Sequence, residues 1–104
     1  MQNVQVLTDV YAKAVQDKLQ EAYHFMDADK RPTTAVEVGR KYFKVIAVHP
    51  GQRSVHSFVD RVTGDVFKPA GWAVPAKGAR FNLLTGMSAL LLAVDPYGGY
   101  LYKH

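Results

Sequence analysis

The spacing of apolar residues changes once along the chain, and this change constrains the fold more than any other feature. Over residues 4–28 apolar side chains recur at steps of three and four, as on one face of an α-helix. From Val36 onward they recur at every second residue, which is typical of β-strands. The sequence therefore predicts an α+β fold, in which an N-terminal helix packs on a small antiparallel sheet of four to five strands and a short second helix follows.

A length of 104 residues fits a single domain, residues 1–104, with an acidic helix at 4–28 and a basic sheet region at 35–104. Asn3 or Thr8 can cap the start of the helix, and Lys30-Arg31-Pro32 is expected to end it. The side chains expected to pack against the sheet are Leu7, Tyr11, Ala14, Ala22 and Phe25.

The strands are separated by turn-forming residues. Residues 42–48 are apolar on both faces, so this strand is expected at the centre of the sheet. The strand at 54–60 should place Val55, Ser57 and Val59 on one face and His56 and Phe58 on the other. The turns fall at 49–52 and 62–65 and precede a strand at 66–68.

The C-terminal third combines a long loop with an apolar segment. Residues 69–80 contain three turn-forming sequences and form the longest irregular stretch, and long loops in compact domains often carry function. A second helix is predicted at 85–94, and Gly98-Gly99 leads into a last short strand at 100–102. Three consecutive leucines, Leu90, Leu91 and Leu92, point in directions 100° apart on this helix. One small core can hardly cover all three, so we expect one of them at a homodimer contact or at another subunit interface.

Charge divides the chain into two parts. Residues 1–39 hold four Lys/Arg and six acids, a net of −2, whereas residues 40–104 hold nine Lys/Arg and three acids, a net of +6. These sums give the net charge of +4 for the whole chain. A basic surface attracts polyanions before specific contacts form, so the composition favours nucleic acid as a partner.

Several classes of protein are disfavoured. The chain has no cysteine, which excludes disulfides and thiolate metal sites and fits a reducing, cytoplasmic setting. No signal peptide is visible, and the longest apolar stretch, at 83–94, is shorter than the roughly 20 residues that span a bilayer. The sequence therefore predicts a soluble protein without a membrane partner.

Five segments together resemble a group of small tailed-bacteriophage proteins. They are KYFKVI at 41–46, SVHSFVD at 54–60, TGDVFKPA at 63–70, PAKGARFNLL at 75–84 and GGYLY at 98–102. The resemblance covers about residues 40–84 and 98–103. It implies a viral protein in the cytoplasm of a bacterial host, and it assigns no catalytic residue.

Catalytic and cofactor-binding patterns are absent from the sequence. Ser54, Ser57, His56 and Asp60 suggest a triad, but residues four apart on a strand are separated by roughly 13 Å, too far for His56 to hydrogen-bond Asp60. Ser54 and His56 lie about 7 Å apart on one face, also beyond hydrogen-bond distance. The histidines do not show metal-ligand spacing, and the glycines do not form a phosphate-binding loop. We therefore expect a protein that is not an enzyme and has no catalytic residue, metal or cofactor.

Basic residues alternate with aromatic ones in the sheet region, a composition that suits binding of phosphates and stacking on unpaired bases. The basic residues are Arg40, Lys41, Lys44, Arg53, Arg61, Lys68, Lys77, Arg80 and Lys103. We expect one connected nucleic-acid-binding surface formed by Lys44, Arg53, Lys68, Lys77 and Arg80, with Trp72 exposed near its edge. The alternative is a module that binds a bacterial host protein, because tryptophan and arginine often anchor protein interfaces.

Overall fold

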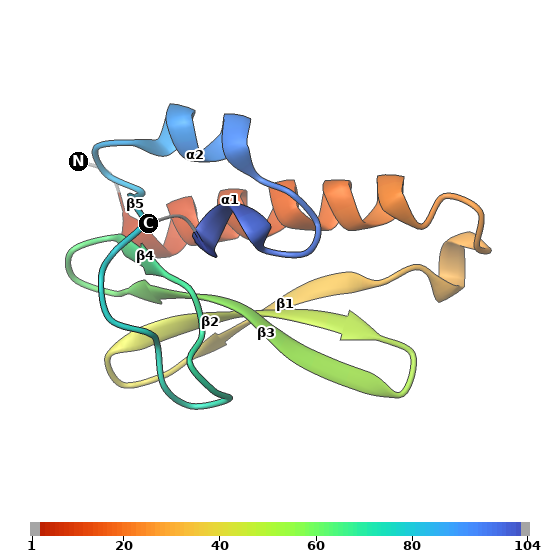
Figure 1. Ribbon diagram of the computed structural model, residues 1–104, viewed down its shortest axis with the longest axis horizontal. Helices are drawn as coiled ribbons and strands as arrows, with labels where there is room; N and C mark the ends of the chain where they lie inside the picture. The colour runs from red at the N-terminus through yellow and green to blue at the C-terminus, as the bar shows by residue number, and fades with distance from the viewer. Residues whose placement is uncertain (1–2, 103–104) are drawn as a thin grey trace.

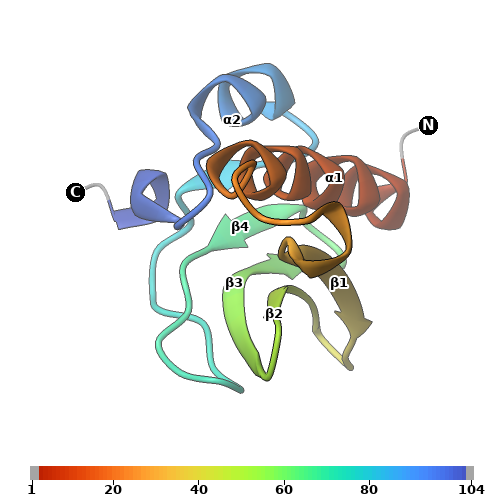
Figure 2. The same ribbon diagram turned by 90° about the vertical axis from the view of Figure 1, so that its right-hand side faces the viewer.

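The computed structural model describes residues 3–102 and has three layers (Figures 1 and 2). Helices α1 (Val4–Ala22) and α2 (Met87–Ala93) lie on one side of the sheet, and the loop 69–80 passes over the opposite side, here called the outer face. The predicted α+β fold is confirmed. Within the described residues, neither helix combines the length and the apolarity needed to cross a membrane.

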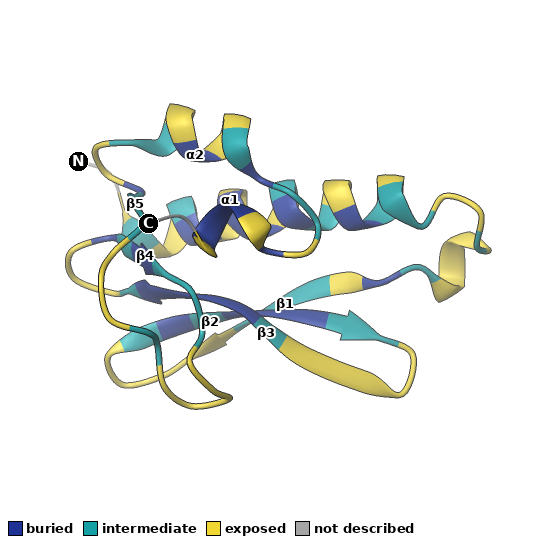
Figure 3. Cartoon of the chain, in the orientation of Figure 1, coloured by how far each residue is buried: buried dark blue, intermediate teal, exposed yellow. Residues whose placement is uncertain are grey.

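Helix α1 begins as its sequence predicts. The Asn3 side chain accepts hydrogen bonds from the backbone N–H groups of Gln5 and Val6, at 2.8 and 3.3 Å, so Asn3 rather than Thr8 is the cap. The residues that α1 buries recur at helical spacing and face the sheet (Figure 3). They are Thr8, Tyr11, Ala12, Val15 and Leu19. Leu7, Ala14 and Ala22 are only partly buried.

The predicted end of the helix at residue 28 is wrong. Helix α1 ends at Ala22, because Tyr23 leaves the helical conformation at φ −110° and ψ 29°. Arg31 then folds back and donates hydrogen bonds to the carbonyls of His24 and Met26, which stabilises a turn instead of further helix. Phe25 is therefore 74% exposed rather than packed on the sheet. A short 3-10 helix, η1 (Ala28–Lys30), follows the turn.

The sheet is an antiparallel meander in which each strand pairs with the next along the chain, in the order β1-β2-β3-β4-β5. Its strands are β1 (Thr33–Val38), β2 (Tyr42–His49), β3 (Gln52–Asp60), β4 (Asp65–Phe67) and β5 (Phe81–Asn82). Strand β2 lies between β1 and β3, as predicted for the strand that is apolar on both faces. The β3–β4 turn requires Gly64, whose φ of +79° is unfavourable for other residues.

A β-bulge at His56 overturns the expected facing of β3. Val45 pairs with Ser57 and Ile46 pairs with Val55, so His56 is an extra residue without a partner on β2. His56 and Ser57 therefore reach the same buried region beneath α1, although strict alternation places them on opposite faces. This arrangement buries both polar side chains, and each of them is hydrogen-bonded.

The C-terminal part differs from expectation in three places. Strand β5, which pairs with β4, was not predicted. Helix α2 spans Met87–Ala93, shorter than 85–94. Residues 99–102 form a 3-10 helix, η2 (Gly99–Tyr102), rather than a strand, because the Asp95 carboxylate accepts hydrogen bonds from the backbone N–H groups of Tyr97, Gly99 and Tyr100 and holds them in a turn.

Candidate nucleic-acid interface

Strand register gathers charged and aromatic residues on the outer face. Glu37 on β1 pairs with Lys44 on β2, Lys44 pairs with Phe58 on β3, and Phe58 pairs with Phe67 on β4. Directly paired residues project to the same face of a sheet, so this row crosses four strands. Phe58 is buried beneath it and makes an edge-to-face contact with Tyr42, with ring centroids 5.8 Å apart.

The loop 69–80 brings Trp72 onto this row. The ammonium group of Lys44 lies 4.5 Å from the centre of a Trp72 ring, and the guanidinium of Arg53 lies 5.7 Å from it. Cation–π attraction of this kind favours Lys44, Arg53 and Trp72 staying together. Trp72 remains 47% exposed, so part of its side chain is available to a ligand.

Glu37 is the member of the site that the sequence reasoning missed. Its carboxylate accepts a hydrogen bond from Arg53 at 2.9 Å and lies 4.0 Å from the Lys44 ammonium. Counting outward from a turn at Gly39-Arg40 would have paired Glu37 with Tyr42. The turn instead lies one residue later, at Arg40-Lys41, where the Gly39 N–H donates to the carbonyl of Tyr42, and this register places Glu37 opposite Lys44. The acidic residue holds the two cations beside Trp72.

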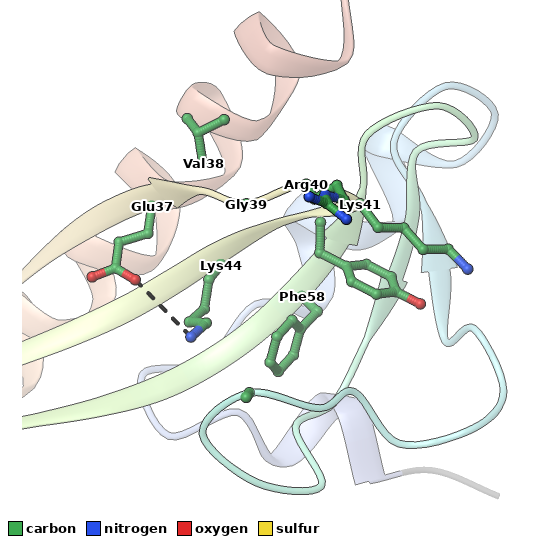
Figure 4. A pocket seen from close by; sticks show the side chains of 9 residues that line it. Glu37, Val38, Gly39, Arg40, Lys41, Lys44 and Phe58 are labelled. Atoms are coloured by element: carbon green, nitrogen blue, oxygen red, sulfur yellow. Dashed lines mark ion pairs between the residues drawn. The ribbon is translucent and has the colours of Figure 1, made fainter.

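A groove of about 220 Å³ opens next to this cluster, between the sheet and the loop (Figure 4). Glu37, Lys44 and Phe58 project into it from three neighbouring strands, and Arg40 and Lys41 lie at its end on the β1–β2 turn. Its other lining residues are Val38, Gly39, Tyr42 and Ala73. Three cations and one carboxylate give the groove a net positive charge.

Arg61 braces the turn that carries Arg40 and Lys41. Its guanidinium donates a hydrogen bond to the carbonyl of Gly39 at 2.5 Å, and its backbone N–H donates to the carbonyl of Lys41 at 3.0 Å. The same guanidinium lies 5.3 Å from the centre of the Phe43 ring. These contacts fix the turn, whereas the side chains of Arg40 and Lys41 are exposed.

The other predicted basic residues lie along the loop and near the C-terminal 3-10 helix. The ammonium of Lys68 lies 4.4 Å from the centre of the Tyr102 ring, and Arg80 donates a hydrogen bond to the carbonyl of Leu101 at 2.8 Å. Lys77 is exposed in the loop. Lys103 lies outside the described residues. Contacts thus join Lys44 and Arg53 at Trp72, and they join Lys68 and Arg80 to η2. That all five cations form one surface stays a prediction.

A second polar cluster is buried beneath α1. The Tyr100 hydroxyl lies 2.8 Å from Nε2 of His56 and 2.6 Å from the Tyr11 hydroxyl, which donates to Oγ of Ser57 at 2.9 Å. Burial lowers the pKa of His56 to about 4 and raises the pKa of Tyr11 to about 12. Burial also raises the pKa of Tyr100. All three are therefore neutral near pH 7 and connect α1, β3 and η2.

The serine–histidine–aspartate grouping considered from the sequence does not assemble in this cluster. Asp60 accepts hydrogen bonds from the backbone N–H groups of Val62 and Thr63, at 2.8 and 2.9 Å, and so caps the β3–β4 turn. His56 instead bonds Tyr100. Over residues 3–102, no group of three or more His, Cys, Asp or Glu side chains is placed to hold a metal ion.

Comparison with known proteins gives a family without an assigned activity. A family model described as a family of unknown function, DUF7717, matches residues 1–103. No curated protein and no solved structure matches the chain.

Proposed function

This chain belongs to the DUF7717 family, and we propose that it is a small non-catalytic module that binds single-stranded nucleic acid on the outer face of its sheet. The observation that carries the proposal is the groove beside Trp72, where Arg40, Lys41 and Lys44 lie next to aromatic rings. Cations neutralise phosphates, and exposed aromatic rings stack on unpaired bases. The site residues proposed from the sequence, Lys44, Arg53, Lys68, Trp72, Lys77 and Arg80, remain part of this proposal.

The groove suits a flexible single strand better than a duplex. It is a local hollow on a small sheet, and within residues 3–102 no helix projects from the outer face to enter a major groove. Arg40 and Lys41 lie at one end, where a backbone phosphate can meet them, while Trp72 lies beside Lys44. A single-stranded nucleic acid that crosses the outer face from this end would first place a phosphate beside Arg40 and Lys41 and then a base beside Trp72.

The setting proposed for this activity is the cytoplasm of a bacterium infected by a phage, which rests on the sequence resemblance alone. Affinity capture from bacterial lysate, with and without nuclease, separates the two classes of partner. Recovery of nucleic acid supports the proposal. Recovery of one bacterial protein that survives nuclease treatment would favour the host-protein alternative.

Trp72 provides a direct test because it is the only tryptophan in the chain. We expect its fluorescence to change when a single-stranded oligonucleotide is added to the native protein. Trp72→Ala should weaken binding by about 1–3 kcal/mol, measured by fluorescence anisotropy of a labelled oligonucleotide, because one stacking contact is lost. Phe25→Ala is the control, since it also removes an exposed aromatic ring but on the turn after α1. Equal affinities of all three proteins would contradict a role for Trp72.

Self-association through α2 is a separate proposal. Leu90 is fully buried, whereas Leu91 is 38% and Leu92 is 90% exposed. We propose that Leu92 contributes to a contact between two copies of the chain. Light scattering at increasing concentration should then show a dimer that Leu92→Glu abolishes while circular dichroism stays unchanged. A native protein that stays monomeric at the highest concentration would rule this contact out.

A further inference from the structure

Glu37 is an unexpected residue for a surface that binds phosphates. A carboxylate repels the phosphate backbone, yet Glu37 lies in the groove among Arg40, Lys41 and Lys44. Its side chain is 45% exposed, so a ligand can reach it. Its orientation is fixed, because one carboxylate oxygen bonds Arg53 at 2.9 Å and the other lies 4.0 Å from the Lys44 ammonium.

The carboxylate keeps capacity for a ligand in spite of these two partners. Its two oxygens offer about four acceptor sites, and an ionised carboxylate can only accept hydrogen bonds. The groove beside it holds about 220 Å³, below the roughly 300–1,000 Å³ of pockets for drug-sized ligands. A volume of this size suits one planar base rather than a larger molecule.

The bases differ in what they present to a carboxylate. Guanine carries two adjacent donors, N1–H and the N2 amino group, on its pairing edge, which match the two oxygens of one carboxylate. Adenine and cytosine present a single amino donor beside an acceptor, and thymine presents one N–H between two carbonyls. In a duplex the guanine donors are already bonded to cytosine, so only an unpaired guanine offers them.

We propose that the groove selects an unpaired guanine, with Glu37 accepting hydrogen bonds from its pairing edge while Arg40 and Lys41 contact neighbouring phosphates. This inference rests on the proposed function and names the base that the same surface prefers. Lys44 and Arg53 serve as positioning residues, because they orient the carboxylate. The neighbouring phosphates make a strand a better ligand than a free guanine nucleotide.

The test compares three single-stranded oligonucleotides of equal length. The first contains thymine only, the second carries single guanines separated by thymines, and the third carries adenines at the positions of those guanines. The guanines are kept apart because consecutive guanines form structures of their own. The native protein should bind the guanine oligonucleotide roughly tenfold more tightly than the other two. Guanosine monophosphate should compete only weakly, because it lacks the neighbouring phosphates.

Glu37→Gln should remove the guanine preference, so that the variant binds the guanine and thymine oligonucleotides with equal affinity, because an amide cannot accept from both guanine donors. Glu21→Gln is the same change at an exposed position of α1, and it should alter neither the guanine preference nor the affinity for the thymine oligonucleotide. Equal binding of all three oligonucleotides by the native protein would overturn the inference and leave the proposed function standing. A Glu37→Gln variant weakened equally for all three would show that Glu37 only supports the fold of the site. Absence of binding to every oligonucleotide at low salt would overturn both proposals.

Discussion

Leu90→Ala is expected to lower the free energy of unfolding by about 2–5 kcal/mol, whereas Leu92→Ala should change it by about 0.5 kcal/mol or less. Leu90 is fully buried in the core that α2 shares with α1 and the sheet, so its removal leaves a cavity. Leu92 points away from that core. Urea denaturation of both variants, at a concentration low enough to keep the protein monomeric, measures the difference. Similar losses in the two variants would contradict the orientation of α2.

Lowering the pH from 7 to 5 should cost about 2 kcal/mol of stability through His56 alone. Burial lowers the pKa of His56 from 6.5 to about 4 in the folded protein, so the unfolded chain binds the proton first as the pH falls. The stability is fully present above pH 6.5 and is lost between pH 6.5 and 4. Most carboxylates are still ionised at pH 5, which separates their effect from that of the histidine.

The pH dependence of unfolding in His56→Gln is the control for this prediction. Glutamine can keep a hydrogen bond to Tyr100 but does not titrate, so the loss of stability between pH 7 and 5 should be much smaller than in the native protein. Equal pH dependence in both proteins would mean that His56 is not buried in a neutral form. The negative charge of Asp95 attracts protonated His56 and so raises its pKa, which partly opposes the lowering caused by burial.

The elements that the sequence predicted well are those set by local patterns. The helical spacing up to Leu19 and the apolar residues at 42–48 survive in α1 and β2. The first pattern buries one face of a helix, and the second supplies apolar side chains to both faces of a strand inside the sheet. The turns at Gly51 and Gly64 also follow from local chemistry, since both residues adopt positive φ. The sequence pointed to the cations and Trp72 of the candidate site because of their chemistry, but it did not indicate which of them contact one another.

The features that the sequence did not predict depend on specific side-chain contacts, some within a few residues and some between distant segments. Arg31 ends the helical region by bonding carbonyls five and seven residues earlier, and Asp95 turns residues 99–102 into a 3-10 helix. The bulge at His56 is stabilised by Tyr100, which is 44 residues away. Glu37 was overlooked because an isolated acid before a turn resembles any solvent-exposed residue until the register places it against Lys44.

The salt dependence of oligonucleotide binding tests the central claim, binding of single-stranded nucleic acid on the outer face, most directly. For the native protein, the logarithm of the binding constant should fall linearly with the logarithm of salt concentration. Arg40→Gln combined with Lys41→Gln should reduce that slope by about 1.4, since each cation that contacts a phosphate of a single strand contributes about 0.7. Lys13→Gln combined with Lys18→Gln removes the same charge at two exposed positions of α1, away from the outer face, and should leave the slope close to the native value. No binding at low salt, or the same slope change in both double variants, would contradict the claim.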